Sequence, residues 1–284
     1  ININRIEVNN ECKDLSGKIA MITGAGSGIG AGIARVLFER GATLALCDLF
    51  GDSAEKTAES LSSDILHDSV DVTKPEDLEN FRDKILDKHG TIDILVANAG
   101  VIGAKGFSER KNYSKDDWDN TFDVNVIGMV NSADAIVDHM KMKEYGKIIN
   151  IASHGGRKPR GLGDMHRGNV QTPYLVSKAA AIQYTHLLAI ELGSFNINVN
   201  AVCPGVIWTP IWEAIAINHI EQNPNLKNKT PKEVFDELAV KARTPLGRGQ
   251  TAEDIGKTVA FFASEDSSEI TGQALNVNGG ASLN

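Results

Sequence analysis

The stretch TGAGSGIG, residues 23–30, follows the apolar run at residues 19–22 and precedes a helical pattern. Unpaired N–H groups at the N-terminus of such a helix, together with the helix dipole, favour phosphate. Gly24 permits a tight turn, Gly28 lets the main chain approach a pyrophosphate, and Gly30 lets the helix pack on the sheet. The spacing G-x-x-x-G-x-G differs from the common G-x-G-x-x-G. The turn alone therefore indicates either a dinucleotide site or a purely structural connection.

Short apolar segments alternate with helical patterns along the rest of the chain. They are rich in Val, Ile and Leu and apolar on both sides, as in buried parallel strands. We expect strands at residues 18–23, 43–48, 69–72, 92–98, 147–152, 198–202 and 275–278, and helices at 29–39, 52–62, 75–88, 115–142, 173–192 and 251–264. This alternation predicts a doubly wound parallel α/β sheet in a single domain at residues 15–284, preceded by an N-terminal extension at residues 1–14.

The composition is ordinary for a soluble globular protein and excludes several classes. The 284 residues are 42% hydrophobic and 23% charged, with a formal net charge of −8. This acidity argues against nucleic acid and anionic membranes as partners, and no run approaches the roughly 18 apolar residues of a membrane span. Cys12, Cys47 and Cys203 are scattered and have no Cys or His at ligand spacing. We therefore expect free thiols, no bound metal and a cytoplasmic location.

Two acidic residues follow the second and third expected strands. Asp48 ends the second strand, where a carboxylate can accept both ribose hydroxyls of an adenosine and repel a 2′-phosphate. No Arg or Lys follows it closely, which favours NAD over NADP; a solvated strand-end Asp is the alternative. Asp71, with Val72 beside it, would lie at the adenine edge or cap the helix before Pro75.

Tyr174 and Lys178 are four residues apart in a helical pattern and therefore share one helix face. An ammonium beside a phenol favours the phenolate, so the phenol can exchange a proton with an alcohol or carbonyl oxygen near neutral pH. Ser153 follows the strand at residues 147–152, and ligands of open α/β sheets bind at the carboxyl ends of strands. Taken singly, a solvated Tyr–Lys pair and a turn-capping serine are the alternatives.

Together these residues resemble the short-chain dehydrogenase/reductase family over roughly residues 15–284. The matching segments are TGAGSGIG, Asn98–Ala99–Gly100, Asn125, Ser153, Tyr174-x-x-x-Lys178 and Pro204–Gly205, in that order. The resemblance implies that Tyr174 is the catalytic acid/base and that Lys178 lowers its pKa and binds the nicotinamide ribose. It implies that Ser153 holds the substrate oxygen, that Asn125 organises a water relay to Lys178, and that the sheet is Rossmann-like with three α/β/α layers.

The same resemblance extends to the cofactor and the assembly. Asn98 to Gly100 would wall the cofactor, and Thr209 would touch the carboxamide. The expected cofactor-binding residues are Gly24, Ser27, Gly28, Ile29, Gly30, Asp48, Asp71, Val72, Asn98, Ala99, Gly100, Tyr174, Lys178, Pro204, Gly205, Ile207 and Thr209. With Asp48, this implies an NAD-dependent homotetramer that oxidises a secondary alcohol or reduces a ketone. The alternatives are a 3-oxoacyl thioester reductase and a non-catalytic NAD(H)-binding sensor.

Two segments interrupt the alternation. Residues 155–172 exceed the spacing usual in the family between Ser153 and Tyr174 and form an inserted loop. Its basic residues are Arg157, Lys158, Arg160 and Arg167, against a single Asp164. The excess charge indicates either a solvated or subunit-contact loop or a clamp for an anionic substrate group. Residues 210–245 would form a substrate lid or pack in the core, and Trp208 would lie beside the nicotinamide or in the core.

Overall fold

A seven-stranded parallel sheet organises the chain in the computed structural model, which describes residues 14–107, 112–157, 171–241 and 243–283. The strands are β1 Ile19–Thr23, β2 Thr43–Asp48, β3 Leu66–Ser69, β4 Ile94–Ala97, β5 Gly146–Ile151, β6 Ile197–Pro204 and β7 Ala274–Val277. Their order is β3-β2-β1-β4-β5-β6-β7, so the winding reverses between β1 and β4. This confirms the predicted doubly wound, Rossmann-like fold and places a topological switch point beside the glycine-rich turn.

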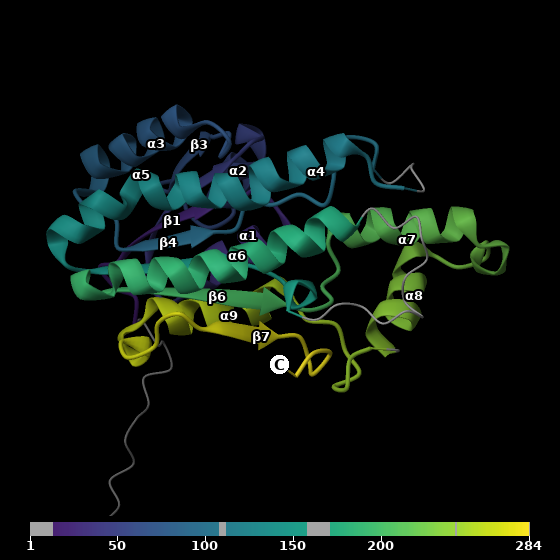
Figure 1. Ribbon diagram of the computed structural model, residues 1–284. Helices are drawn as coiled ribbons and strands as arrows, with labels where there is room; N and C mark the ends of the chain where they lie inside the picture. The colour runs from purple at the N-terminus through teal and green to yellow at the C-terminus, as the bar shows by residue number, and fades with distance from the viewer. Residues whose placement is uncertain (1–13, 108–111, 158–170, 242, 284) are drawn as a thin grey trace, which may run out of the picture.

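Helices cover both faces of the sheet (Figure 1). They are α1 Gly28–Glu39, α2 Gly51–Glu59, α3 Pro75–His89, α4 Lys115–Phe122, α5 Gly128–Lys143, α6 Gln171–Leu192, α7 Pro210–Gln222, α8 Pro231–Phe235 and α9 Ala252–Ala263. Alternate residues of β1 serve two separate cores: Met21 packs with α3, α5 and α6, and Ile22 packs with α1 and α9. Because both faces are buried, β4 is apolar throughout and β1 is apolar up to Thr23.

The third strand was predicted wrongly, at residues 69–72 instead of Leu66–Ser69. β3 is an edge strand whose side chains are half-buried or exposed, so it includes the polar residues His67 and Asp68 and lacks an apolar run. Val70 and Val72, which suggested the strand, are buried in the connection that follows it. The apolar signal therefore marked core residues of a loop.

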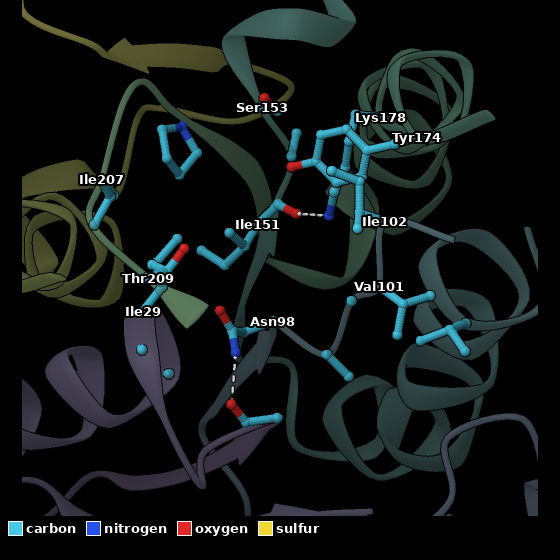
Figure 2. Close-up of a pocket in the computed structure, with 18 of the residues that line it drawn as sticks. Ile29, Asn98, Val101, Ile102, Ile151, Ser153, Tyr174, Lys178, Ile207 and Thr209 are labelled. Carbon is cyan, nitrogen blue, oxygen red and sulfur yellow. Dashed lines mark hydrogen bonds between the residues drawn. The ribbon is translucent and has the colours of Figure 1, made fainter. Parts of the chain in front are cut away.

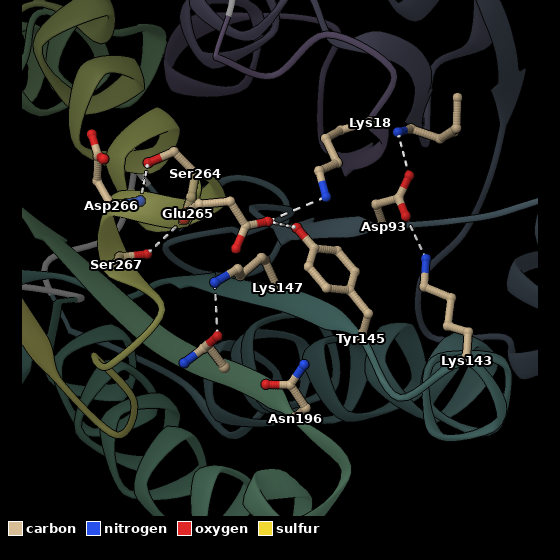
Figure 3. A network of polar contacts seen from close by, with 12 residues as sticks. Lys18, Asp93, Lys143, Tyr145, Lys147, Asn196, Ser264, Glu265, Asp266 and Ser267 are labelled. Carbon is tan, nitrogen blue, oxygen red and sulfur yellow. Dashed lines mark hydrogen bonds and ion pairs between the residues drawn. The ribbon is translucent and has the colours of Figure 1, made fainter.

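At the amino ends of the strands, polar contacts join segments that are distant in sequence (Figure 3). Lys18 and the Tyr145 hydroxyl both donate to a Glu265 carboxylate oxygen, at 3.3 and 3.0 Å. Asp93 accepts the first main-chain N–H of β1 at 2.8 Å and forms an ion pair with Lys143 of α5. These contacts hold the end of the sheet opposite to the cavity described below.

A histidine in this region makes stability depend on pH. The main-chain N–H of Ile92 donates to Nε2 of His139 at 3.2 Å, so this nitrogen must be unprotonated. Burial, and then the Lys143 ammonium, lower the pKa of His139 from its ordinary 6.5. A depressed folded-state pKa means that its contribution to the free energy of unfolding is complete above about pH 6.5 and is lost as pH falls through the folded value. We expect the urea concentration at the midpoint of unfolding to decrease as the pH is lowered below about 6.5. The decrease with pH should be less steep in His139→Gln. Equal slopes in the wild-type protein and the variant would contradict this role of His139.

Candidate active site

A cavity of about 420 Å³ lies at the carboxyl ends of the strands, at the switch point between β1 and β4. Open α/β sheets bind their ligands at this position. Of the residues expected from the sequence to be catalytic or cofactor-binding, all except Asn125 line it. Figure 2 shows how they converge from separate elements. The fold thus brings the glycine-rich turn, the acidic strand ends and the Ser–Tyr–Lys group around one space.

The glycines of the turn are required by geometry. Gly24 and Gly28 have φ values of +62° and +54°, in the left-handed region. A Cβ on Gly24 would lie 2.7 Å from Cα of Ala99, and one on Gly30 would lie 2.1 Å from the Gly24 carbonyl oxygen. Ser27 precedes α1, and its side chain makes no capping hydrogen bond. The N–H groups of the first helical turn are therefore left to a ligand in the cavity.

Asp48 is held in place by the turn, through a glycine that the sequence analysis missed. The N–H of Gly26 donates to Oδ2 of Asp48 at 2.9 Å, and the N–H of Phe50 donates to Oδ1 at 3.1 Å. A Cβ on Gly26 would lie 2.6 Å from Cβ of Ser53. Gly26 is the second of the four glycines in TGAGSGIG, and its presence beside the three expected ones was the available signal. The carboxylate is thus fixed at the edge of the cavity that it lines.

Of the two roles considered for Asp71, the structure excludes the cap of the helix that begins at Pro75, and the adenine edge stays a prediction. Its Oδ1 accepts hydrogen bonds from the N–H and the hydroxyl of Thr73, at 3.0 and 2.7 Å. These bonds close the turn before α3, whose own N-cap is Lys74 without a side-chain cap. Burial raises the pKa of Asp71, but the bonds from Thr73 and the nearby Lys74 ammonium lower it overall. Asp71 and Val72 also line the cavity.

The end of β4 is bound to the glycine-rich turn. Asn98 donates from Nδ2 to the carbonyls of Thr23 and Gly24, at 3.0 and 2.9 Å, and Figure 2 draws one of these two bonds. The Thr23 hydroxyl accepts the N–H groups of Asn98 and Ala99, both at 3.1 Å. The segment from Asn98 to Gly100 therefore lines the cavity and also fixes the two strand ends relative to each other.

Asn125 lies behind the cavity wall. It is fully buried in a π-helical turn, η2 (Asp123–Ile127), which divides the single helix expected at residues 115–142 into α4 and α5. Its Oδ1 accepts the N–H of Val101 at 2.8 Å, and Nδ2 donates to the Val101 carbonyl and the Ser177 hydroxyl, at 2.9 and 3.0 Å. Both Nδ2 hydrogens are therefore engaged. The side chain joins the end of β4 to α6, and a water relay to Lys178 stays a prediction.

Ser153, Tyr174 and Lys178 meet at one end of the cavity (Figure 2). Lys178 donates from Nζ to the Ile151 carbonyl at 2.7 Å, and Nζ lies 5.7 Å from the centre of the Tyr174 ring. Burial lowers the pKa of Lys178 to about 8. The Ser153 hydroxyl oxygen accepts the N–H of Gly155 at 3.1 Å, so it also caps a turn. A tyrosine hydroxyl, a serine hydroxyl and a confined ammonium can together bind an oxygen and exchange its proton.

The turn after Ser153, η3 (His154–Gly156), packs directly on α6 and so sets Ser153 relative to Tyr174 and Lys178. His154 is held by its Nδ1, which lies 2.9 Å from the Pro204 carbonyl oxygen. A Cβ on Gly156 would lie 2.5 Å from the main-chain carbon of Lys178. The glycine at this position is therefore required for the close approach of the turn to the helix.

Replacing this glycine should destabilise the protein. Gly156→Ala places its methyl group against helix backbone, which cannot move independently, and overpacking of this kind costs about 1–3 kcal/mol. The measurement is the free energy of unfolding in urea. Gly193→Ala is the matched control, because a Cβ there meets nothing within 4 Å. Equal losses in the two variants would contradict the packing argument.

The connection from β6 to α7 closes the cavity against the glycine-rich turn. Pro204 at the end of β6 and three residues of this connection, Gly205, Ile207 and Thr209, all line the cavity. A Cβ on Gly205 would lie 2.4 Å from Oε1 of Gln250, and Ile207 pairs with the same glutamine in a β-bridge. The methyl group of Thr209 lies 3.7 Å from where a Cβ on Gly28 would be, and its hydroxyl accepts the Trp212 N–H at the start of α7.

The described part of the inserted loop does not support an anion clamp. Residues 158–170, which contain Lys158, Arg160, Asp164 and Arg167, lie outside the described residues. Arg157 donates to the Ala274 carbonyl of β7 and is not among the lining residues of the cavity. Its guanidinium therefore binds the edge strand rather than a ligand.

The two tryptophans that flank the start of α7 differ. Both pack edge-on against Phe235, with ring centroids 5.1 Å away for Trp208 and 5.4 Å for Trp212. Trp208 belongs to this small core and does not line the cavity, whereas Trp212 does. Of the two positions considered for Trp208, beside the nicotinamide or in the core, the structure therefore shows the core. Trp212 and Ile215, which line the cavity, belong to the stretch expected to form a lid or pack in the core, whereas Val101, Ile102 and Leu175 were not expected to line it.

Two other features are absent from the parts of the chain that the structure describes. No group of three or more His, Cys, Asp or Glu residues there could hold a metal ion. Likewise, none of the helices within those ranges combines the length and the apolar character needed to cross a membrane.

A crevice that suits a dinucleotide at one end and carries proton-exchanging groups at the other is the arrangement of a nucleotide-dependent oxidoreductase. The chain belongs to the short-chain dehydrogenase/reductase family of oxidoreductases. The family model that matches it, at residues 24–282, is described as enoyl-(acyl carrier protein) reductase.

Known relatives match over nearly their whole length. The chain is 34% identical over 272 residues to (2S)-[(R)-hydroxy(phenyl)methyl]succinyl-CoA dehydrogenase subunit BbsD of Thauera aromatica, covering 95% of this chain and 98% of that protein. It is 33% identical over 269 residues to 3-oxoacyl-[acyl-carrier-protein] reductase FabG of Thermotoga maritima, covering 94% and 98%. The crystal structure of an NAD⁺-bound xylitol dehydrogenase matches with a TM-score of 0.80 and 30% identity, covering 94% and 99%.

Proposed function

We propose that this protein is an NAD(H)-dependent dehydrogenase that interconverts a secondary alcohol and a ketone. The observation that carries the proposal is one cavity with Asp48 and the glycine-rich turn along one part of its wall and Ser153, Tyr174 and Lys178 along another. A bound nicotinamide supplies the hydride acceptor or donor for such a reaction. The protein supplies position and the path of the proton.

Each residue of the site has a separate role in the proposed reaction. The Tyr174 hydroxyl takes the proton from the alcohol in oxidation and returns it to the carbonyl oxygen in reduction. Lys178, fixed on the Ile151 carbonyl, favours the phenolate form of Tyr174 and binds the nicotinamide ribose. Ser153 orients the substrate oxygen. Asn125 acts as a positioning residue through Val101.

The residues present fit NAD. The uncapped start of α1, with Ser27, Gly28 and Ile29 along the cavity, suits the pyrophosphate. Asp48, fixed by two main-chain N–H groups, suits an unphosphorylated adenosine ribose and disfavours a 2′-phosphate. Val72 and Asp71 would flank the adenine, and Thr209 would meet the carboxamide. The NAD⁺-bound state of the related xylitol dehydrogenase supports this reading.

Reduction of a 3-oxoacyl thioester is the second candidate. The relative of that activity in Thermotoga maritima and the description of the family model favour it. Asp48 argues against the phosphorylated cofactor that biosynthetic reductases of this kind would use. A non-catalytic NAD(H) sensor is the third, but a sensor needs no hydroxyl on Tyr174.

The test is a matrix of cofactors and substrates. NADH formation is followed by its near-ultraviolet absorbance with a panel of secondary alcohols, and NADH consumption with ketones and 3-oxoacyl thioesters, each repeated with the phosphorylated cofactor. We expect turnover with NAD⁺ and secondary alcohols. Turnover of thioesters alone would select the second candidate. Tight NAD⁺ binding without any turnover would select the sensor.

We also propose a homotetramer in the cytoplasm. Leu187 and Ile190 on α6 and Met142 at the end of α5 are 57%, 80% and 80% exposed, which gives these helices an apolar surface suited to another copy of the chain. The buried free thiols of Cys47 and Cys203 suit a reducing compartment. Analytical ultracentrifugation tests the assembly.

The part of the chain at residues 210–245, whose Trp212 and Ile215 line the cavity, is the proposed lid.

A further inference from the structure

The cavity that holds the Ser–Tyr–Lys group also has apolar lining residues from three separate elements. Val101 and Ile102 follow β4, Leu175 lies on α6, and Trp212 and Ile215 lie on α7. Figure 2 shows Ile102 beside Tyr174, with Val101 next along the same wall. None of these residues belongs to a motif. Their convergence on one space is a property of the fold.

These walls are packed from behind. Ile102 is only 4% exposed. Leu175 rests on the turn after Ser153, since a Cβ on Gly155 would lie 2.5 Å from its Cδ2. Trp212 packs edge-on against Phe235, which is itself 2% exposed. Ile102, Leu175 and Trp212 are thus each supported by neighbouring parts of the chain.

The charges along the part of the cavity that the structure describes do not suit an anionic substrate. Lys178 is the one lysine or arginine among the lining residues that the structure describes, and it already donates to the Ile151 carbonyl. Arg157 donates to the Ala274 carbonyl. A carboxylate placed against Trp212 and Ile215 would lose hydration without gaining a cation there.

We infer that the substrate carries a bulky apolar group, aryl or alicyclic, on its carbinol carbon, and that this group packs against Trp212. The inference rests on the proposed alcohol–ketone reaction and adds the substrate class to it. Apolar walls of this kind discriminate by size, at about 10–200-fold per methylene group. A ring should therefore be favoured strongly over a methyl or ethyl group.

The experiment compares three secondary alcohols with NAD⁺: 1-phenylethanol, 2-butanol and 3-hydroxybutanoate. We expect kcat/KM for 1-phenylethanol to exceed that of either other alcohol by at least about tenfold. Trp212→Ala should lower the ratio of kcat/KM for 1-phenylethanol over 2-butanol about tenfold. Trp208→Ala is the matched control, because Trp208 also packs in the cluster around Phe235 but does not line the cavity. The control therefore removes an indole ring from the cluster without changing the cavity wall. It should leave the ratio unchanged.

The outcomes separate this inference from the proposed function. If 2-butanol or 3-hydroxybutanoate reacts as well as 1-phenylethanol, or if both tryptophan variants shift the ratio equally, the substrate class is wrong and the alcohol–ketone reaction stands. If no secondary alcohol or ketone reacts while NAD⁺ binds, the proposed function itself is overturned. Should Trp212→Ala fail to fold, Ile215→Ala on the same helix provides the same test of the ratio.

Discussion

Tyr174→Phe should lower kcat by about 10²–10⁴-fold, the range that general acid–base catalysis contributes, while NAD binding is retained. The variant keeps the ring beside Lys178 and removes only the hydroxyl that exchanges the proton. Lys178 also keeps its bond to the Ile151 carbonyl, so the ammonium should stay in place. Steady-state kinetics and a cofactor titration, performed on the same preparation, separate the two effects.

Tyr184→Phe is the matched control for this prediction. Tyr184 lies on the same helix, α6, but it packs at the edge of the core under that face of the sheet and does not line the cavity. Loss of the Tyr184 hydroxyl should leave kcat nearly unchanged. Near-normal turnover in Tyr174→Phe, or an equal loss in Tyr184→Phe, would mean that the proton passes through another group.

The second large effect should be in cofactor choice. The wild-type protein should bind NAD roughly 10–1,000-fold more tightly than NADP, because Asp48 accepts the ribose hydroxyls and repels the 2′-phosphate. Asp48→Ser should reduce that ratio by at least about tenfold. The same variant also removes the acceptor of the Gly26 and Phe50 N–H groups, so the turn itself will loosen. The ratio of the two dissociation constants is the proper readout, since loosening affects both cofactors alike.

Asp71→Asn provides the control, as it changes the other carboxylate along the same part of the cavity. Asp71 is engaged with Thr73 and is expected near the adenine, which both cofactors share. It should weaken both cofactors equally. Equal affinity of the wild-type protein for NAD and NADP would refute the assignment of Asp48.

The secondary structure was most predictable where burial is symmetrical. β2 was predicted at its observed bounds because its central residues are buried on both faces and need apolar side chains throughout. β3 was displaced by three residues because an edge strand tolerates His67 and Asp68, while the following loop supplies Val70 and Val72 to the core. A local apolar pattern indicates which residues are buried. At the edge of a sheet, the buried residues are not the same as the residues that pair in the strand, so the pattern does not locate the strand.

The π-helical turn at Asp123–Ile127 could not be predicted from the local pattern. Asn125 sits in that turn and bonds to Val101 and Ser177, which come from distant parts of the chain. The residues around it continue an ordinary helical period, so nothing nearby marks the interruption. The contacts that accompany the turn form only when β4 and α6 are already side by side.

By itself, the sequence determined the α/β alternation, the glycine-rich turn and which residues at strand ends and on one helix face line the cavity, while the roles of these residues stay predictions. For such residues, spacing along the chain is enough, because β1, α1 and α6 carry them into place as rigid units. Only the tertiary structure decided that Trp212 faces the cavity while Trp208 packs behind it, and that Arg157 binds β7. An apolar ring gains from burial in a core as in a binding site, and a guanidinium donates to any carbonyl within reach. The neighbours that settle such cases are supplied by the packing of distant segments.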